Sequence, residues 1–112
     1  MNGQELATAV QYGCDLLVVL VDNGAYGTIR MHQEREFPER VSGTTLHNPD
    51  FAALARAYGG WSARVEDNAQ FDAALAEAAS RRGLRLLHLV IDIEQLSAGG
   101  ASISSLRARA KA

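Results

Sequence analysis

The sequence predicts an α/β fold, with a partial doubly wound, mainly parallel sheet of about three strands and flanking helices. Two apolar runs, Leu16–Val21 and Leu84–Ile91, do not alternate apolar with polar residues. That pattern is typical of strands covered on both faces. Helical patterns lie between the two runs, and an alternation of strands and helices favours parallel pairing.

The first predicted helix covers residues 2–12, because Leu6, Ala9 and Val10 share one face and Gly13 offers a stop. The strand at 16–21 follows directly. Cys14, the single cysteine, excludes an internal disulfide, and we expect it to be a small buried hydrophobe beside the strand.

After a loop-rich segment, Asn48-Pro49-Asp50 predicts the start of a second helix. Asn48 would be its cap, with proline at the first helical position. Apolar residues then recur at three- and four-residue spacing until Gly59-Gly60 ends the helix.

Residues 61–65 are a short candidate strand. Asp67, with Gln70 three positions later, resembles a capping box that opens a further helix. The apolar stripe of that helix consists of Phe71, Leu75 and Ala78. The strand at 84–91 follows, and His88 within it is expected to be a core residue and not a metal ligand.

The composition excludes several classes of protein. Eleven basic and thirteen acidic residues among 112 give a net charge of -2, so nothing favours binding to nucleic acid or an anionic membrane. The longest apolar run is too short to span a bilayer, and no signal sequence is evident. We therefore expect a cytoplasmic protein.

Two segments have ambiguous patterns. The charged residues Glu34, Arg35, Glu36, Glu39 and Arg40 predict a solvated loop or helix end. The stretch 94–112, which from Ser97 mixes Gly, Ala, Ser and Arg, predicts a mobile tail or a peripheral helix.

The candidate site lies where the first strand ends, at Asp22-Asn23-Gly24. Open α/β sheets bind ligands outside the carboxyl ends of their strands. The amide oxygen of Asn23 suits a hard cation such as Mg²⁺, and Gly24 and Gly27 allow close approach of the backbone to a ligand. Turn chemistry alone also explains these residues, and it is the interpretation that the pattern by itself favours, with a ligand site as the alternative.

The stretch "NGQELATAVQYGCDLLVVLVDNGAYGTIRMHQE" resembles the thiamine-diphosphate enzymes of the acetolactate synthase and 2-oxo-acid decarboxylase group. The similarity runs from Asn2 to about Asp92 and includes "NPDFAALARAYGG". It implies that residues 1–93 are the C-terminal part of a thiamine diphosphate-binding domain.

The resemblance also implies roles for individual residues. Asn23 matches a side-chain ligand of the Mg²⁺ that bridges the cofactor diphosphate, and Ala25 matches a position whose carbonyl oxygen is another ligand. The cofactor-binding wall would be formed by Tyr26, Gly27 and Thr28. Ile29 and His32 would shape the substrate pocket.

The sequence departs from the family at three points. Asp22 replaces the usual asparagine, which we expect to leave the site intact. His32 replaces a frequent tryptophan, which favours a less defined decarboxylase or ligase over acetolactate synthase proper. The Gly-Asp-Gly carboxylate, the main Mg²⁺ ligand, should lie just before Met1, which resembles an interior methionine of the family.

The resemblance therefore implies a fragment of a thiamine-diphosphate- and Mg²⁺-dependent enzyme that decarboxylates or ligates small 2-oxo acids. We expect this chain to be inactive alone, because one amide and some carbonyls cannot hold Mg²⁺ without a carboxylate. The complete enzyme would be a homo-oligomer, and its middle domain often holds FAD. The alternative is a non-catalytic α/β module from a truncated gene that self-associates through an exposed sheet edge.

Overall fold

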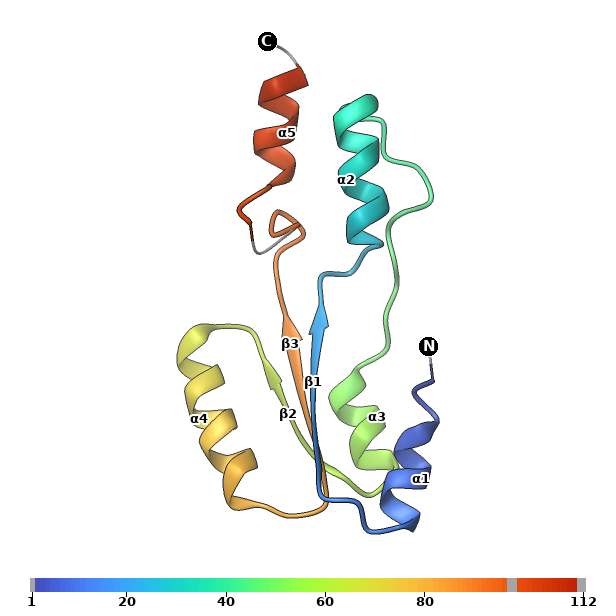
Figure 1. Ribbon diagram of the computed structural model, residues 1–112, viewed down its shortest axis with the longest axis vertical. Coiled ribbons are helices and arrows are strands. Elements are labelled where there is room, and N and C mark those ends of the chain that lie inside the picture. Colours follow the sequence, from blue (N-terminus) through green and yellow to red (C-terminus); the bar gives the residue numbers. More distant parts are fainter. Residues whose placement is uncertain (1, 97–98, 111–112) are drawn as a thin grey trace. The chain divides into compact units, whose positions relative to one another are not determined.

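The computed structural model describes residues 2–96 and 99–110 (Figure 1). Met1 and the predicted tail residues 97–98 and 111–112 lie outside the described residues. The elements are α1 (Glu5–Gln11), β1 (Leu16–Asp22), α2 (Gly27–Glu36), α3 (Phe51–Ala57), β2 (Trp61–Val65), α4 (Asn68–Ser80), β3 (Leu84–Val90) and α5 (Ile103–Ala110).

The chain forms two compact units. Residues 1–21 and 49–90 make up the first, which we call the sheet unit. Residues 22–48 and 91–112 make up the second, which we call the loop unit.

The described residues of the sheet unit contain a three-stranded parallel sheet in the order β1-β3-β2. β2 and β3 pair in parallel from Trp61↔Arg85 to Val65↔Leu89. Helices lie on both faces of this sheet, α4 on one and α1 and α3 on the other (Figure 1). The predicted fold class is therefore confirmed.

The core between α4 and the sheet is apolar. Val65, Ala74, Ala78 and Leu87 form a buried cluster there. On the other face of β3, His88 is buried as expected, with its ring edge-on to Phe51 at 5.3 Å between centroids.

The two apolar strands differ in burial. β3 is buried along most of its length, but in β1 Leu16, Val19 and Val21 are 43%, 49% and 60% exposed. The prediction of a strand at 16–21 is confirmed, whereas the expectation that it is covered on both faces is wrong for these residues. β1 stands at an edge of the sheet, so fewer elements cover it.

The helix starts were predicted with mixed success. Asp67 caps α4 as expected, accepting the Gln70 amide at 2.8 Å, while the Gln70 side chain accepts the Glu66 amide at 2.9 Å. The predicted cap at Asn48 is wrong, because Asp50 caps α3 by accepting the Ala53 amide at 2.9 Å.

Three local expectations are corrected. Leu75 was assigned to the apolar stripe of α4, but it is 38% exposed and Ala74 is buried instead. Cys14 is exposed. The loop-rich segment contains the helix α2, which periodicity did not reveal because its buried residue is the charged Glu34.

Within the described residues, no helix has the length and apolar character needed to cross a membrane.

Candidate functional site

The loop that follows β1 is held by the side chain of Asp22. Its Oδ1 accepts the Gly24 amide at 2.9 Å and the Asn48 side-chain amide at 2.7 Å. Gly24 has φ +65°, a conformation that glycine adopts without strain. Asp22 therefore shapes the turn and joins it to Asn48, 26 positions further along the chain.

Asn23, the predicted metal ligand, is half-buried inside this turn. Its Oδ1 accepts the Ala25 amide at 3.1 Å. An amide oxygen has two lone pairs, so this hydrogen bond uses one of them. A Cβ at Gly27 would lie 2.7 Å from Asn23 Nδ2, so only glycine fits at that position without displacing Asn23.

A second segment runs antiparallel to the loop and fixes its backbone. The Tyr26 amide donates to the Thr44 carbonyl at 2.9 Å, and the Leu46 amide donates to the Gly24 carbonyl at 2.8 Å. These two bonds flank an isolated bridge between Ala25 and Thr45. Neither bond uses the Ala25 carbonyl oxygen, the second predicted metal ligand.

The loop leads directly into α2, whose first residue is Gly27. Tyr26 is the N-cap residue, and its side chain makes no capping hydrogen bond to the amides of the first turn. Such amides, together with the positive end of the helix dipole, favour an anion. Thr28 lies in this first turn and is exposed, and Tyr26 is 49% exposed.

The predicted pocket residues lie further along α2. Ile29 is 55% exposed and His32 is exposed. The structure thus places Asn23, Ala25, Tyr26, Gly27, Thr28, Ile29 and His32 on one continuous stretch of loop and helix.

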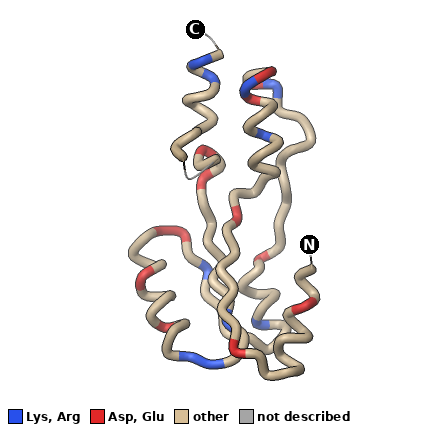
Figure 2. Tube along the Cα trace, viewed as in Figure 1, with Lys and Arg blue, Asp and Glu red and all other residues tan. Residues whose placement is uncertain are grey.

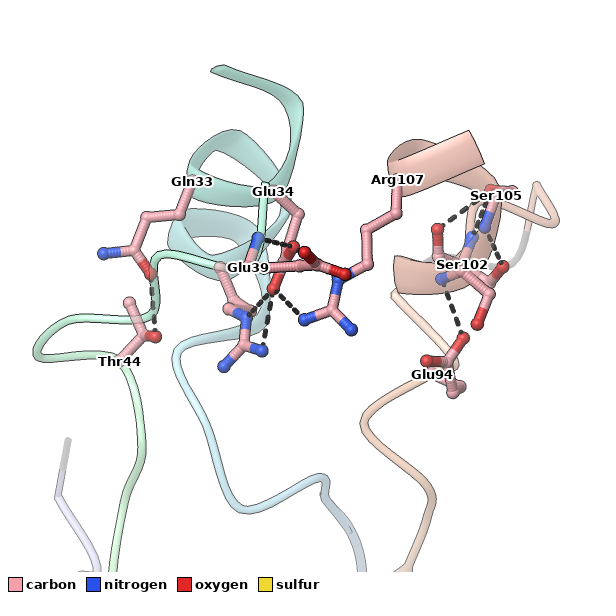
Figure 3. Close-up of polar contacts among 10 residues, drawn as sticks. Gln33, Glu34, Glu39, Thr44, Glu94, Ser102, Ser105 and Arg107 are labelled. Atoms are coloured by element: carbon pink, nitrogen blue, oxygen red, sulfur yellow. Dashed lines mark hydrogen bonds and ion pairs between the residues drawn. The ribbon is translucent and has the colours of Figure 1, made fainter. Parts of the chain in front are cut away.

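A charged cluster lies at the second half of α2 (Figure 3). Glu34 is only 1% exposed and is bound by Arg30 of α2 and by Arg107 of α5. The expectation that Glu34 belongs to a solvated segment is therefore wrong. Hydrogen bonds from Arg107, and secondarily from the Glu39 amide and Arg30, lower the pKa of Glu34 to about 2 despite its burial.

The described residues hold no clustered set of the usual metal-binding side chains. No group of three or more His, Cys, Asp or Glu side chains is placed to hold a metal ion there. Asn23 Oδ1 and the Ala25 carbonyl are two oxygen donors of the type that Mg²⁺ prefers, but they supply no negative charge. They fit part of a magnesium site.

The comparisons with known proteins point to one family. Residues 1–89 match the family described as "Thiamine pyrophosphate enzyme, C-terminal TPP binding domain". The chain is 42% identical over 93 residues to acetolactate synthase isozyme 2 large subunit of Escherichia coli K12, covering 82% of this chain and 17% of that protein.

Two further relatives come from a yeast and an archaeon. The chain is 33% identical over 107 residues to the mitochondrial acetolactate synthase catalytic subunit of Saccharomyces cerevisiae, covering 92% of this chain and 16% of that protein. It is 33% identical over 93 residues to the probable acetolactate synthase large subunit of Methanocaldococcus jannaschii, covering 82% of this chain and 16% of that protein. The chain thus spans under a fifth of the length of these relatives.

Two features of the site were missed in the sequence. The Asp22–Asn48 hydrogen bond and the Glu34–Arg107 ion pair join residues 26 and 73 positions apart, for which a single sequence has no signal. The four-residue spacing of Arg30 and Glu34 was the one clue to α2 that could have been used.

Proposed function

This chain belongs to the thiamine pyrophosphate enzyme family, whose C-terminal TPP-binding domain it matches, and we propose that its loop 23–28 holds Mg²⁺ and the diphosphate of thiamine diphosphate. The complete enzyme would decarboxylate or ligate small 2-oxo acids. The observation that carries the proposal is the placement, in one turn at the end of β1, of an amide oxygen and a helix N-terminus that its N-cap side chain does not cap.

The metal contacts in this proposal are the Asn23 side chain and the Ala25 backbone. The remaining lone pair of Asn23 Oδ1 and the Ala25 carbonyl oxygen would each bind Mg²⁺. The hydrogen bonds around Asp22, Gly24 and Tyr26 keep the loop in shape, so both donors are preorganised before the ion binds.

The diphosphate contacts are assigned to the start of α2. The amides of Gly27 and Thr28 belong to the first turn of the helix, where a negative group is favoured. The absence of a Cβ at Gly27 supports this role, because a side chain there would displace Asn23. Tyr26 would form the wall beside the cofactor.

The substrate contacts are assigned to Ile29 and His32, one turn further on. When bound, thiamine diphosphate supplies the reactive carbon and the electron sink for 2-oxo acid chemistry. The apolar side chain of Ile29 would exclude water from the reacting carbonyl group. His32 would contact the acceptor or the departing group by hydrogen bonding.

We further propose that this chain alone is inactive. Diphosphate with Mg²⁺ needs a carboxylate to complete an oxygen shell, and the two donors of loop 23–28, Asn23 Oδ1 and the Ala25 carbonyl, are both neutral. The chain also covers only 17% of the Escherichia coli isozyme 2 relative, so most of a complete enzyme lies outside it.

Two titrations test these proposals. In calorimetry with Mg²⁺ and thiamine diphosphate, we expect no saturable binding at micromolar concentrations. Micromolar affinity would refute the argument that this chain alone lacks the ligands needed to hold the cofactor. In NMR at millimolar ligand, we expect shifts of the Ala25, Gly27 and Thr28 amides that Asn23→Ala abolishes. Asn68→Ala, an exposed asparagine at the start of α4, is the matched control and should retain them. Shifts that persist in Asn23→Ala, or an absence of shifts at this loop, contradict the assignment.

The exposed edge of β1 favours a second candidate function. Leu16, Val19 and Val21 expose apolar surface on an edge strand, which supports self-association of a non-catalytic module through this edge. Analytical ultracentrifugation tests it: we expect a dimer that Val19→Lys converts to monomer, whereas a wild-type monomer at all concentrations excludes this candidate.

A further inference from the structure

Three segments of the loop unit converge on the carboxylate of Glu34 (Figure 3). Oε2 accepts the Glu39 backbone amide at 3.0 Å and Arg107 Nε at 2.8 Å. Oε1 accepts Arg107 Nη2 at 2.9 Å and Arg30 Nε at 2.8 Å. One buried side chain thus joins α2, the turn that follows it and α5.

The chemistry of this cluster makes Arg107 its decisive partner. A carboxylate that is 1% exposed is costly unless it is fully hydrogen-bonded and its charge is compensated. Arg107 binds it through two parallel N–H groups, the strongest geometry for such a pair. Ile103 and Leu106 of α5 are also buried, so the ion pair is the polar part of the packing of α5 on α2.

Of the two basic residues of α5, one pairs with Glu34. The charged residues of α5 are Arg107 and Arg109, both basic, whereas α2 carries both signs (Figure 2). Arg109 is exposed, whereas Arg107 is half-buried against the acidic partner. The helix lies beyond residues 1–89, the part that matches the family model.

The residue next to Glu34 connects α2 to the candidate loop. Gln33 Nε2 donates to the Ser42 carbonyl at 2.6 Å, and the Thr44 hydroxyl donates to Gln33 Oε1 at 3.0 Å. The carbonyl of the buried Thr44 in turn accepts the Tyr26 amide at 2.9 Å. The position of α2 therefore sets the position of the segment that pairs with loop 23–28.

We infer that Glu34 and Arg107 are positioning residues: their ion pair fastens α5 to α2 and thereby holds loop 23–28 in its hydrogen-bonded shape. The inference rests on the proposed function only in what it takes loop 23–28 to bind. The restraint itself is a property of the free chain, and it is measurable with no cofactor present.

Amide hydrogen exchange of the full 112-residue chain, followed by NMR, tests the restraint. In Arg107→Gln, the amides of Tyr26 and Leu46 should exchange about tenfold faster than in the wild type, because a charge-assisted hydrogen bond to a buried group is lost. Arg109→Gln, the same substitution on the same helix, should leave both rates within about twofold. An unchanged Leu87 amide verifies that the sheet unit remains folded.

A double variant separates the ion pair from a general effect on α5. If Arg107 acts through Glu34, then Arg107→Gln adds no further acceleration at Tyr26 in a Glu34→Gln background. Acceleration confined to α5 amides, or equal acceleration in both backgrounds, overturns the inference. Repeating the wild-type measurement with millimolar Mg²⁺ and thiamine diphosphate tests the proposed function separately. If the ligands do not slow exchange of the loop amides, the proposed function fails, but the comparison of the variants without ligand still stands.

Discussion

The sheet unit and the loop unit are stabilised by different interactions. In the sheet unit, Leu87 and the alanines of α4 form a buried apolar cluster against the strands. In the loop unit, the buried contacts include two polar side chains, Glu34 and Thr44, each held by hydrogen bonds.

The difference indicates which part of the molecule has a stability that depends on the protonation of a single group. Apolar burial depends little on pH, so the cluster between α4 and the sheet provides a constant scaffold. A network built on one carboxylate responds to protonation and to loss of a single partner. The candidate loop is thus attached to the part of the chain whose stability is the more easily changed.

The largest expected effect comes from the apolar core. Leu87→Ala should lower the free energy of unfolding by about 3 kcal/mol, because Leu87 is fully buried between β3 and α4. Leu75→Ala, which truncates a 38% exposed leucine on α4, should cost less than about 1 kcal/mol. Urea unfolding followed by circular dichroism measures both, and equal losses would contradict the assigned core.

Acid should weaken the ion pair of the loop unit. The pKa of Glu34 is lowered from 4.5 to about 2, so its contribution is complete above 4.5 and is lost as the pH falls through about 2. That contribution is on the order of 2 kcal/mol, typical of hydrogen bonds to a charged group. An NMR titration of the Glu34 carboxyl carbon should show a midpoint near 2, and Arg107→Gln should raise it. A midpoint at 4.5 in the wild type would show that the ion pair does not form.

The same contrast explains how much could be predicted from the sequence. Strand and helix patterns in the sheet unit depend on apolar periodicity, which one sequence displays, and β2, β3 and α4 were predicted near their observed bounds. In the loop unit, α2 buries a charged residue, and its partner Arg107 lies 73 positions away. A single sequence does not show which polar residues pair over such separations, so these contacts are known only from the structure.

The misplaced cap at Asn48 follows the same rule. Asn48, Pro49 and Asp50 all suit a helix start, and local propensity could not choose among them. In the structure Asn48 Nδ2 donates to Asp22 Oδ1, and Asp50 is the residue whose side chain accepts the Ala53 amide and caps α3. The candidate site residues were placed on one stretch because they are consecutive in sequence, whereas the contacts that hold them were not foreseen.

A smaller effect is expected for the polar part of the sheet unit. Asp67→Ala removes the side-chain cap of α4 and should cost about 1 kcal/mol, less than Leu87→Ala. Asp67→Asn keeps an acceptor oxygen at the same place and should cost no more than a few tenths of a kcal/mol. Urea unfolding compares the two, and an equal loss in both variants would mean that charge, and not the hydrogen bond, is responsible.

The smallest expected effect has the opposite sign and belongs to the loop unit. Glu39 has φ +67°, a strained conformation for a residue other than glycine, and its amide donates to Glu34. Glu39→Gly keeps that amide and removes the strain, so it should stabilise the loop unit by about 0.5 kcal/mol, net of the lost side-chain interactions. Glu36→Gly, three residues earlier at the end of α2, should instead destabilise by up to about 1 kcal/mol, because glycine is unfavourable in a helix. Thermal unfolding followed through the α2 amides by NMR distinguishes these signs, and destabilisation by both variants would show that the Glu39 side chain outweighs its backbone strain.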